Sequence, residues 1–115
     1  MNSKQFEEFV DGVFKRCKEL LLRKGNDYAD KDDVFGNFKR MSEKIKTTMK
    51  KDLEPESVCE MFKLIKIDRI HNLCDGNREP FNESVYDSYL DELNYLLLEM
   101  GIVYEKSLNK KKQNE

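Results

Sequence analysis

The amino-acid sequence predicts an all-α fold, a compact bundle of about four helices in one domain. Apolar side chains recur every three or four residues along extended stretches, as they do on one face of a helix. No segment outside these stretches shows the every-second-residue alternation of a strand. A chain of 115 residues is of single-domain size, and it is small enough that forming an oligomer would help to bury its apolar surface.

The first helix is expected to run from about Ser3 to Lys24. Its apolar residues keep the helical rhythm, and Gly25 supplies a stop directly after two basic residues. A polar loop from Gly25 to Asp33 follows, with four aspartates and Tyr28. The aspartates lack the glycine and the terminal glutamate of a calcium-binding loop, so no calcium site is expected there.

The second and third helices are marked by their first residues. Either Asp32 or Asp33 caps the second helix, whose apolar residues continue to Met49 without a clear stop signal. Pro55 suits the first turn of the third helix, which runs to about Cys74.

The fourth helix is expected from about Glu83 to Ser107, after a loop marked by a glycine and Pro80. The segment 109–115 lacks apolar groups and is expected as a disordered tail behind a single helical domain of residues 1–108.

Charge and composition limit the range of partners. Charged residues make up 38% of the chain and nearly cancel, leaving a formal net charge of -2. No global field favours DNA, RNA or an anionic membrane, and the basic stretch 39–51 is expected to be a solvated helix face, so a nucleic-acid partner is disfavoured. No apolar run is long enough for a signal peptide or a membrane span, and the three cysteines are scattered. We therefore expect a soluble, cytoplasmic protein with reduced cysteines and no membrane partner.

Four polar residues form a stripe on the fourth helix. Glu83, Asp87, Asp91 and Asn94 follow one another at spacings of four, four and three. They fall within an arc of roughly 80° on the helix. Stacked carboxylates repel one another unless a cation or a hydrogen-bonded partner lies between them, so this polar stripe is a candidate site. It borders an apolar arc that is expected to pack, whereas Glu92 and Glu99 are expected on a solvated side. The apolar arc consists of Tyr86, Leu90, Leu93, Leu97 and Tyr104.

The third helix carries apolar residues almost all the way round, which predicts a central position or a subunit interface. Arg69 falls in the middle of its apolar arc, and Lys66 lies beside it. A guanidinium in such a place requires a carboxylate or a phosphate, because burying an unpaired charge costs several kcal/mol. Two compatible interpretations remain: a salt bridge from Arg69 to Asp87 or Asp91, and a bound phosphate.

Four segments together resemble the phage and bacterial family called nucleotide modification associated domain 1. They are KGNDY at 24–28, the pair Asn37 and Phe38, KIDRI at 66–70, and ESVYDSYLDELNY at 83–95. The resemblance spans about residues 5 to 98 and implies a helical protein with a role linked to nucleotides. The chain is more distantly similar to the MazG-like all-α nucleoside triphosphate pyrophosphatases. Those enzymes hold magnesium with paired acidic motifs, of which this chain offers only Glu56 and Glu60 on the third helix.

These observations give a candidate ligand site between the third and fourth helices. Binding a nucleotide needs cations for phosphate, a ring for the base and an amide for a base edge. No catalytic residue is assigned. Magnesium is expected only if the protein is an enzyme, and its candidate ligands are Glu60, Glu83, Asp87 and Asp91. The candidate ligand-binding residues are Lys24, Asp27, Tyr28, Asn37, Phe38, Lys66, Arg69, Asp87, Asn94 and Tyr95.

Three function classes follow. The first is a small phage-type, viral protein that captures a phosphate-containing nucleotide, such as a cyclic signalling nucleotide, without turnover. Such a homo-oligomeric protein would act in the host cytoplasm against a host defence. The second is a magnesium-dependent nucleotide pyrophosphohydrolase of MazG-like type. The third is a protein-interaction module that inhibits a host factor.

Overall fold

The computed structural model describes residues 1–28, 33–75 and 81–114, with the backbone alone for 24–28. Within these ranges the chain is all-helical and contains no strand, which confirms the predicted class. The helices are α1 (Ser3–Tyr28), α2 (Gly36–Met49), α3 (Pro55–Cys74) and α4 (Glu83–Gln113). None of the described helices is both long and apolar enough to cross a membrane.

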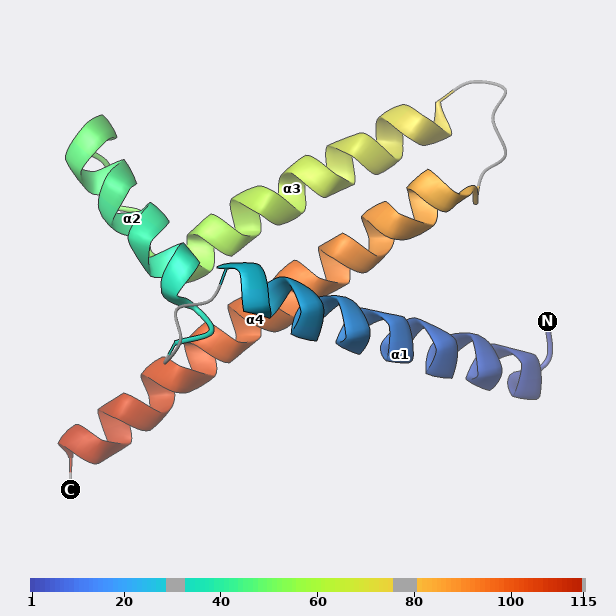
Figure 1. Ribbon diagram of the computed structural model, residues 1–115, viewed down its shortest axis with the longest axis horizontal. Coiled ribbons are helices and arrows are strands. Elements are labelled where there is room, and N and C mark those ends of the chain that lie inside the picture. Colours follow the sequence, from blue (N-terminus) through green and yellow to red (C-terminus); the bar gives the residue numbers. More distant parts are fainter. Residues whose placement is uncertain (29–32, 76–80, 115) are drawn as a thin grey trace.

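An antiparallel pair of helices, α3 and α4, forms the centre of the molecule (Figure 1). A short connection between two helices favours this antiparallel packing. Helix α2 packs near the beginning of α3, and α1 crosses α4 and extends away from the other helices toward the N-terminus. Each outer helix therefore covers a different part of the central pair.

The arrangement is more open than the expected compact bundle. The radius of gyration is 17.0 Å. A compact domain of this length would have a radius of about 13 Å. The long α4 and the projecting α1 account for the difference, since both continue past the helices that they contact.

Two separate apolar cores hold the helices together. Cys17 and Leu20 of α1 pack with Leu90 of α4 in the smaller core. The larger core joins α2, α3 and α4 and contains four buried residues. These are Phe38, Val58, Cys59 and Ile102. The smaller core contacts the first half of α4, and the larger core contacts its second half.

The first helix continues past its expected end. Gly25 was expected to stop the helix after Lys24, but α1 runs to Tyr28. Glycine in a helix interior costs only about 1 kcal/mol relative to alanine, and no proline follows it to break the helix. The loop expected at 25–33 is therefore helical at its beginning, and its residues 29–32 lie outside the described part of the chain.

The second helix is not capped by an aspartate. Its N-cap residue is Phe35, which makes no side-chain cap hydrogen bond, and Asp32 lies outside the described residues. Asp33 instead organises the turn before the helix, because its carboxylate accepts the Phe35 N–H at 3.0 Å. The helix ends at Met49, because its C-cap residue Lys50 has a left-handed φ of 56° that stops the α-helical pattern.

The third helix has the bounds that its proline and spacing predicted. The fourth begins at Glu83 as expected, because Asn82 caps it by accepting the Val85 N–H at 2.9 Å. Its expected end at Ser107 is wrong, and the residues expected as a disordered tail continue the helix to Gln113 as exposed turns. Three lysines in the last turn favour this extension, since cations interact well with the carbonyl end of a helix.

Candidate functional site

The polar stripe on α4 runs from solvent into the protein. Glu83 and Asp87 are exposed, Asp91 is half-buried, and Asn94 is only 7% exposed. Glu83 also has a local explanation, because a carboxylate in the first turn is stabilised by the helix N-terminus. Only the inner end of the stripe, Asp91 and Asn94, therefore has the surroundings of a site.

A lysine and an aspartate join α3 to α4 at this inner end. Lys66 Nζ lies 3.0 Å from Asp91 Oδ2, and the two side chains are 22% and 19% exposed. Asp91 is close to α1 as well. Burial and, to a smaller degree, the negative charge of Asp91 raise the pKa of the Cys17 thiol. We call Cys17, Lys66, Asp91 and Asn94 the three-helix junction.

Asn94 has an unsatisfied polar atom. Its Oδ1 is buried and accepts no hydrogen bond from any residue that the structure describes. Such an orphaned acceptor costs about 1–3 kcal/mol. Ser88, the other buried polar residue of α4, differs because its hydroxyl donates to the Ser84 carbonyl at 2.8 Å. The Asn94 carboxamide thus needs a donor that the described residues do not supply.

Arg69 was expected to be buried in the middle of an apolar arc, and this prediction is wrong for the single chain. Arg69 is exposed, and it lies one turn after Ile65 on a side of α3 that also exposes Met61 and Leu64. The apolar arc was placed correctly on the helix, but much of it faces outward. The cation that pairs with Asp91 across the helix interface is Lys66. The role of Arg69 as a ligand residue stays a prediction.

The candidate aromatic rings occupy internal positions where they are described. The Tyr95 ring stacks on the Phe62 ring, with the two centroids 5.5 Å apart. The Phe38 ring meets the Phe62 ring edge-on, at a centroid distance of 6.2 Å. Phe38 is buried in the larger core, so its ring has no free face for a base. Asn37 is half-buried in the first turn of α2.

Three candidate residues lie near the end of α1. Lys24, Asp27 and Tyr28 are helical, and their side chains fall outside the described part of the chain. Their assignment to the ligand site therefore stays a prediction.

The candidate metal ligands do not come together. In the part of the chain that the structure describes, no group of three His, Cys, Asp or Glu side chains is placed to hold a metal ion. Glu60, Glu83 and Asp87 are all exposed, and Asp91 is paired with Lys66. The magnesium site therefore stays a prediction that would need these side chains to rearrange.

Glu92 and Glu99 were expected on a solvated side, and both are half-buried. Glu99 Oε1 is buried without a hydrogen-bond partner among the described residues. Burial raises the pKa of the Cys59 thiol to about 12, and the nearby negative charge of Glu99 is the next largest cause. The sequence spacing could have indicated that Glu99 is partly buried, because Glu99 lies four residues after Tyr95 and three residues before Ile102 on the same helix.

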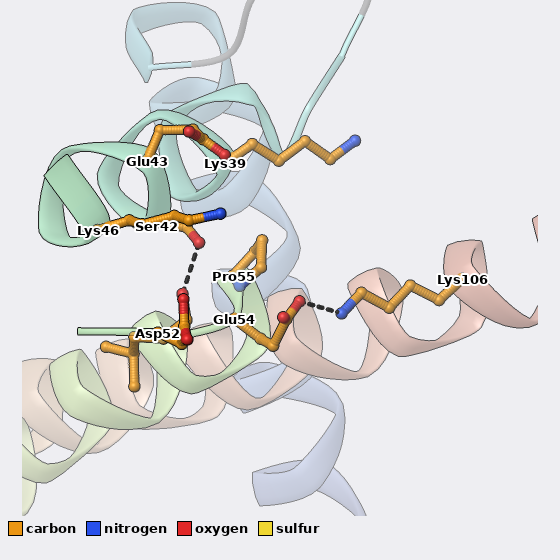
Figure 2. Close-up of a pocket in the computed structure, with 9 residues that line it drawn as sticks. Lys39, Ser42, Glu43, Lys46, Asp52, Glu54, Pro55 and Lys106 are labelled. Carbon is orange, nitrogen blue, oxygen red and sulfur yellow. Dashed lines mark hydrogen bonds and ion pairs between the residues drawn. The ribbon is translucent and has the colours of Figure 1, made fainter. Parts of the chain in front are cut away.

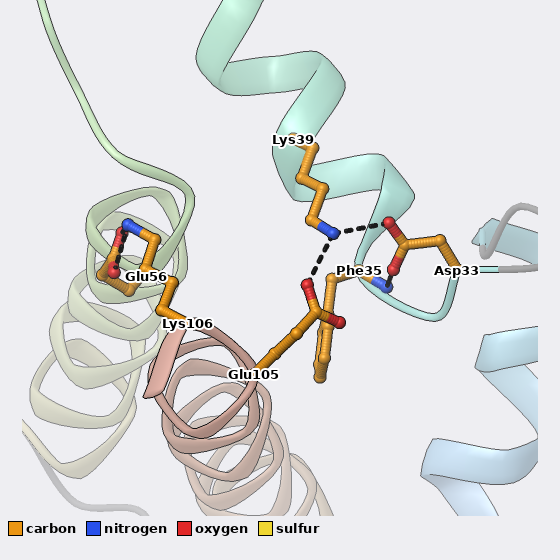
Figure 3. A network of polar contacts seen from close by, with 6 residues as sticks. All are labelled: Asp33, Phe35, Lys39, Glu56, Glu105 and Lys106. Carbon is orange, nitrogen blue, oxygen red and sulfur yellow. Dashed lines mark hydrogen bonds and ion pairs between the residues drawn. The ribbon is translucent and has the colours of Figure 1, made fainter. Parts of the chain in front are cut away.

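A second polar region, which the sequence did not indicate, lies where α2 meets the beginning of α3 and the second half of α4. Lys39 Nζ contacts Asp33 at 2.6 Å and Glu105 at 2.7 Å (Figure 3). The hydrogen bond from Lys39 holds the pKa of Asp33 below its ordinary value. The hydrogen bonds that Lys39 donates to Asp33 and Glu105 raise the pKa of Lys39. These contacts fasten α2 to α4.

A hollow of about 390 Å³ lies beside this region (Figure 2). Lys106, which lines it, contacts Glu54 and Glu56 at 2.8 Å each. Lys39, which also lines it, is bridged to two carboxylates in the same way. Each of these two lysines contacts two carboxylates, whereas Lys66 contacts one among the described residues, so these two lysines are weaker candidates for binding an anion than Lys66 of the three-helix junction.

No protein-family model, no curated protein and no solved structure matches this chain.

Proposed function

We propose that the three-helix junction binds a phosphate-containing nucleotide without turning it over. The observation that carries this proposal is the buried, unsatisfied Oδ1 of Asn94. It lies one helical turn after Asp91 and therefore beside the Lys66 ion pair. A nucleotide offers both of the groups that such a place can use, an N–H or O–H donor for the amide oxygen and a phosphate for the lysine.

Lys66 can serve a phosphate without leaving Asp91. An ammonium group has three donors, and the contact with Asp91 uses one of them. The aspartate also holds the flexible lysine side chain in one place, which lowers the entropy lost on binding. With 22% of its side chain exposed, Lys66 remains open to a ligand.

The finer parts of the proposal rest on the resemblance to nucleotide modification associated domain 1. They are a phage origin, capture of a cyclic signalling nucleotide as an anti-defence measure, and action as an oligomer in the host cytoplasm. The more distant MazG-like resemblance supports the same helical architecture. Under this proposal Arg69, which is exposed, would meet the ligand from outside the junction.

A second candidate function is a protein-interaction module. It is favoured by the exposed apolar side of α3, where Met61, Leu64 and Ile65 face outward. A partner protein covering that side would leave the three-helix junction without a ligand. The same experiment separates the two functions.

The experiment is a binding assay with a panel of nucleoside triphosphates and cyclic nucleotides, with and without magnesium. Calorimetry measures binding, and chromatography of the recovered ligand detects turnover. The key variant is Asn94→Leu, which removes the unsatisfied amide and should leave the protein equally or more stable, because an orphaned acceptor is lost. Ser88→Ala, at the other buried polar residue of α4, is the control.

We expect at least a tenfold loss of affinity in Asn94→Leu, with unchanged binding in Ser88→Ala and recovery of intact ligand. Equal binding by a folded Asn94→Leu variant would contradict the proposed site. Release of pyrophosphate that depends on magnesium would replace capture by the hydrolase function. If no nucleotide binds to the wild-type chain, the interaction module becomes the better account.

A further inference from the structure

One side of α4 carries a regular row of exposed apolar residues. Tyr89, Leu93, Leu96, Met100 and Val103 succeed one another at spacings of four, three, four and three. All five are between 38% and 57% exposed. This alternation is the pattern by which two helices pack in a coiled coil. We call these five residues the outer seam.

The chain exposes more surface than a compact monomer of its mass would. The chain has an accessible surface of 9016 Å². A compact folded monomer of 13.7 kDa is expected to expose about 6,600 Å². The excess of about 2,400 Å² per chain falls in the range that obligate homodimers bury, roughly 1,000–2,500 Å² per partner.

We propose that a second copy of this chain covers the outer seam, with α4 packing against α4. The seam contains no charged residue, so the same patch can face itself across a two-fold axis without repulsion. A short peptide would cover only part of the seam and would leave most of the excess surface in water. This inference does not depend on the proposed nucleotide function, because the three-helix junction lies on another side of α4.

The position on α4 differs from the interface that the sequence suggested on α3. Apolar exposure on α3 is limited to Met61, Leu64 and Ile65, which cover little more than one helical turn. The outer seam covers about four turns, from Tyr89 to Val103. The longer row offers the larger interface, and the shorter one provides a control.

Sedimentation equilibrium tests the proposal with the full chain. The wild type should sediment at about twice the monomer mass of 13.7 kDa at tens of micromolar. The double variant Leu96→Glu/Met100→Glu should sediment as a monomer, because it would place four carboxylates in the interface. Leu64→Glu, at a leucine of α3 that is 61% exposed, should remain a dimer.

A monomeric wild type would overturn the proposal, and so would a dimeric double variant or dissociation by Leu64→Glu alone. Far-UV circular dichroism checks that each variant keeps its helices. If the double variant loses them, the milder change Met100→Lys replaces it, since Met100 is the most exposed residue of the seam. Met100→Lys should weaken dimerisation at least tenfold, and an unchanged dissociation constant would overturn the proposal.

Discussion

The two sides of α4 carry equally apolar residues and meet different surroundings. On the packed side Leu90 and Ile102 are each 1% exposed, whereas on the outer seam Met100 and Val103 are 57% and 51% exposed. Both sides keep helical spacing, so the sequence pattern does not distinguish them. The comparison teaches that apolar periodicity identifies residues that favour burial, while the covering surface comes from elsewhere in the chain or from another molecule.

The largest expected effect separates these two sides directly. Ile102→Ala should lower the free energy of unfolding by about 2–5 kcal/mol, because it leaves a cavity in the larger core. Val103→Ala on the outer seam should cost less than about 0.5 kcal/mol when the protein is dilute enough to be monomeric. Urea unfolding under those conditions measures both. Equal losses would break the distinction between the packed side and the seam.

The ion pair between Lys66 of α3 and Asp91 of α4 should have an intermediate effect. Lys66→Met should lower the free energy of unfolding by about 1–3 kcal/mol, because half-buried Asp91 loses its cation. The double variant Lys66→Met/Asp91→Leu should regain at least half of that loss. Arg16→Met is the control, since its pair with Glu19 at 3.4 Å is exposed and should contribute less than about 0.5 kcal/mol. Urea unfolding decides, and a loss in the double variant as large as in Lys66→Met would contradict this account.

Two helical glycines extend the comparison to backbone positions. A Cβ on Gly101 of α4 would lie 2.7 Å from the ring of Phe35, so Gly101→Ala should lower the free energy of unfolding by about 1–2 kcal/mol despite its better helix propensity. A Cβ on Gly12 of α1 would meet no atom within 4 Å. Gly12→Ala should therefore stabilise the protein by up to about 1 kcal/mol. Thermal unfolding should shift in opposite directions, and a shift in the same direction would contradict the Phe35 contact.

The smallest expected effect concerns the salt bridge between Asp33, in the turn before α2, and Lys39 of α2. The lowered pKa of Asp33 means that its ion pair stabilises the fold above the ordinary carboxyl pKa and is lost as the pH falls through the native value. Asp33→Asn keeps an oxygen for the Phe35 N–H and removes the charge. The wild type should be more stable than this variant by about 0.2–1 kcal/mol at pH 6.

Urea unfolding across the acidic range checks this difference. The advantage of the wild type should shrink as the pH falls below the ordinary carboxyl pKa and be lost as it passes through the lowered native pKa of Asp33. The raised pKa of Lys39 predicts a separate loss at alkaline pH, as the ammonium deprotonates. A difference between the two proteins that stays constant from pH 6 to pH 3 would show that Asp33 acts without its charge.

Local signals alone were sufficient for part of the fold. The all-α class, the bounds of α3 and the first residue of α4 follow from periodicity, Pro55, and the glycine and proline in the sequence before Glu83. The ends of α1 and α4 did not follow, because Gly25 only weakens a helix slightly and the lysines of the C-terminal tail favour its continuation. A helix end is set by small energy differences that neighbouring turns can outweigh.

The candidate site shows the same division. The sequence by itself determined that Lys66 and the stripe from Glu83 to Asn94 lie on particular arcs of their helices, since the turn of 100° per residue is a local property. Only the tertiary structure decided that Asp91 pairs with Lys66, that Arg69 faces outward and that Asn94 is buried. Those outcomes depend on which arc meets another helix. That choice comes from long-range packing of α1 and α3 against α4, which no spacing within one helix encodes.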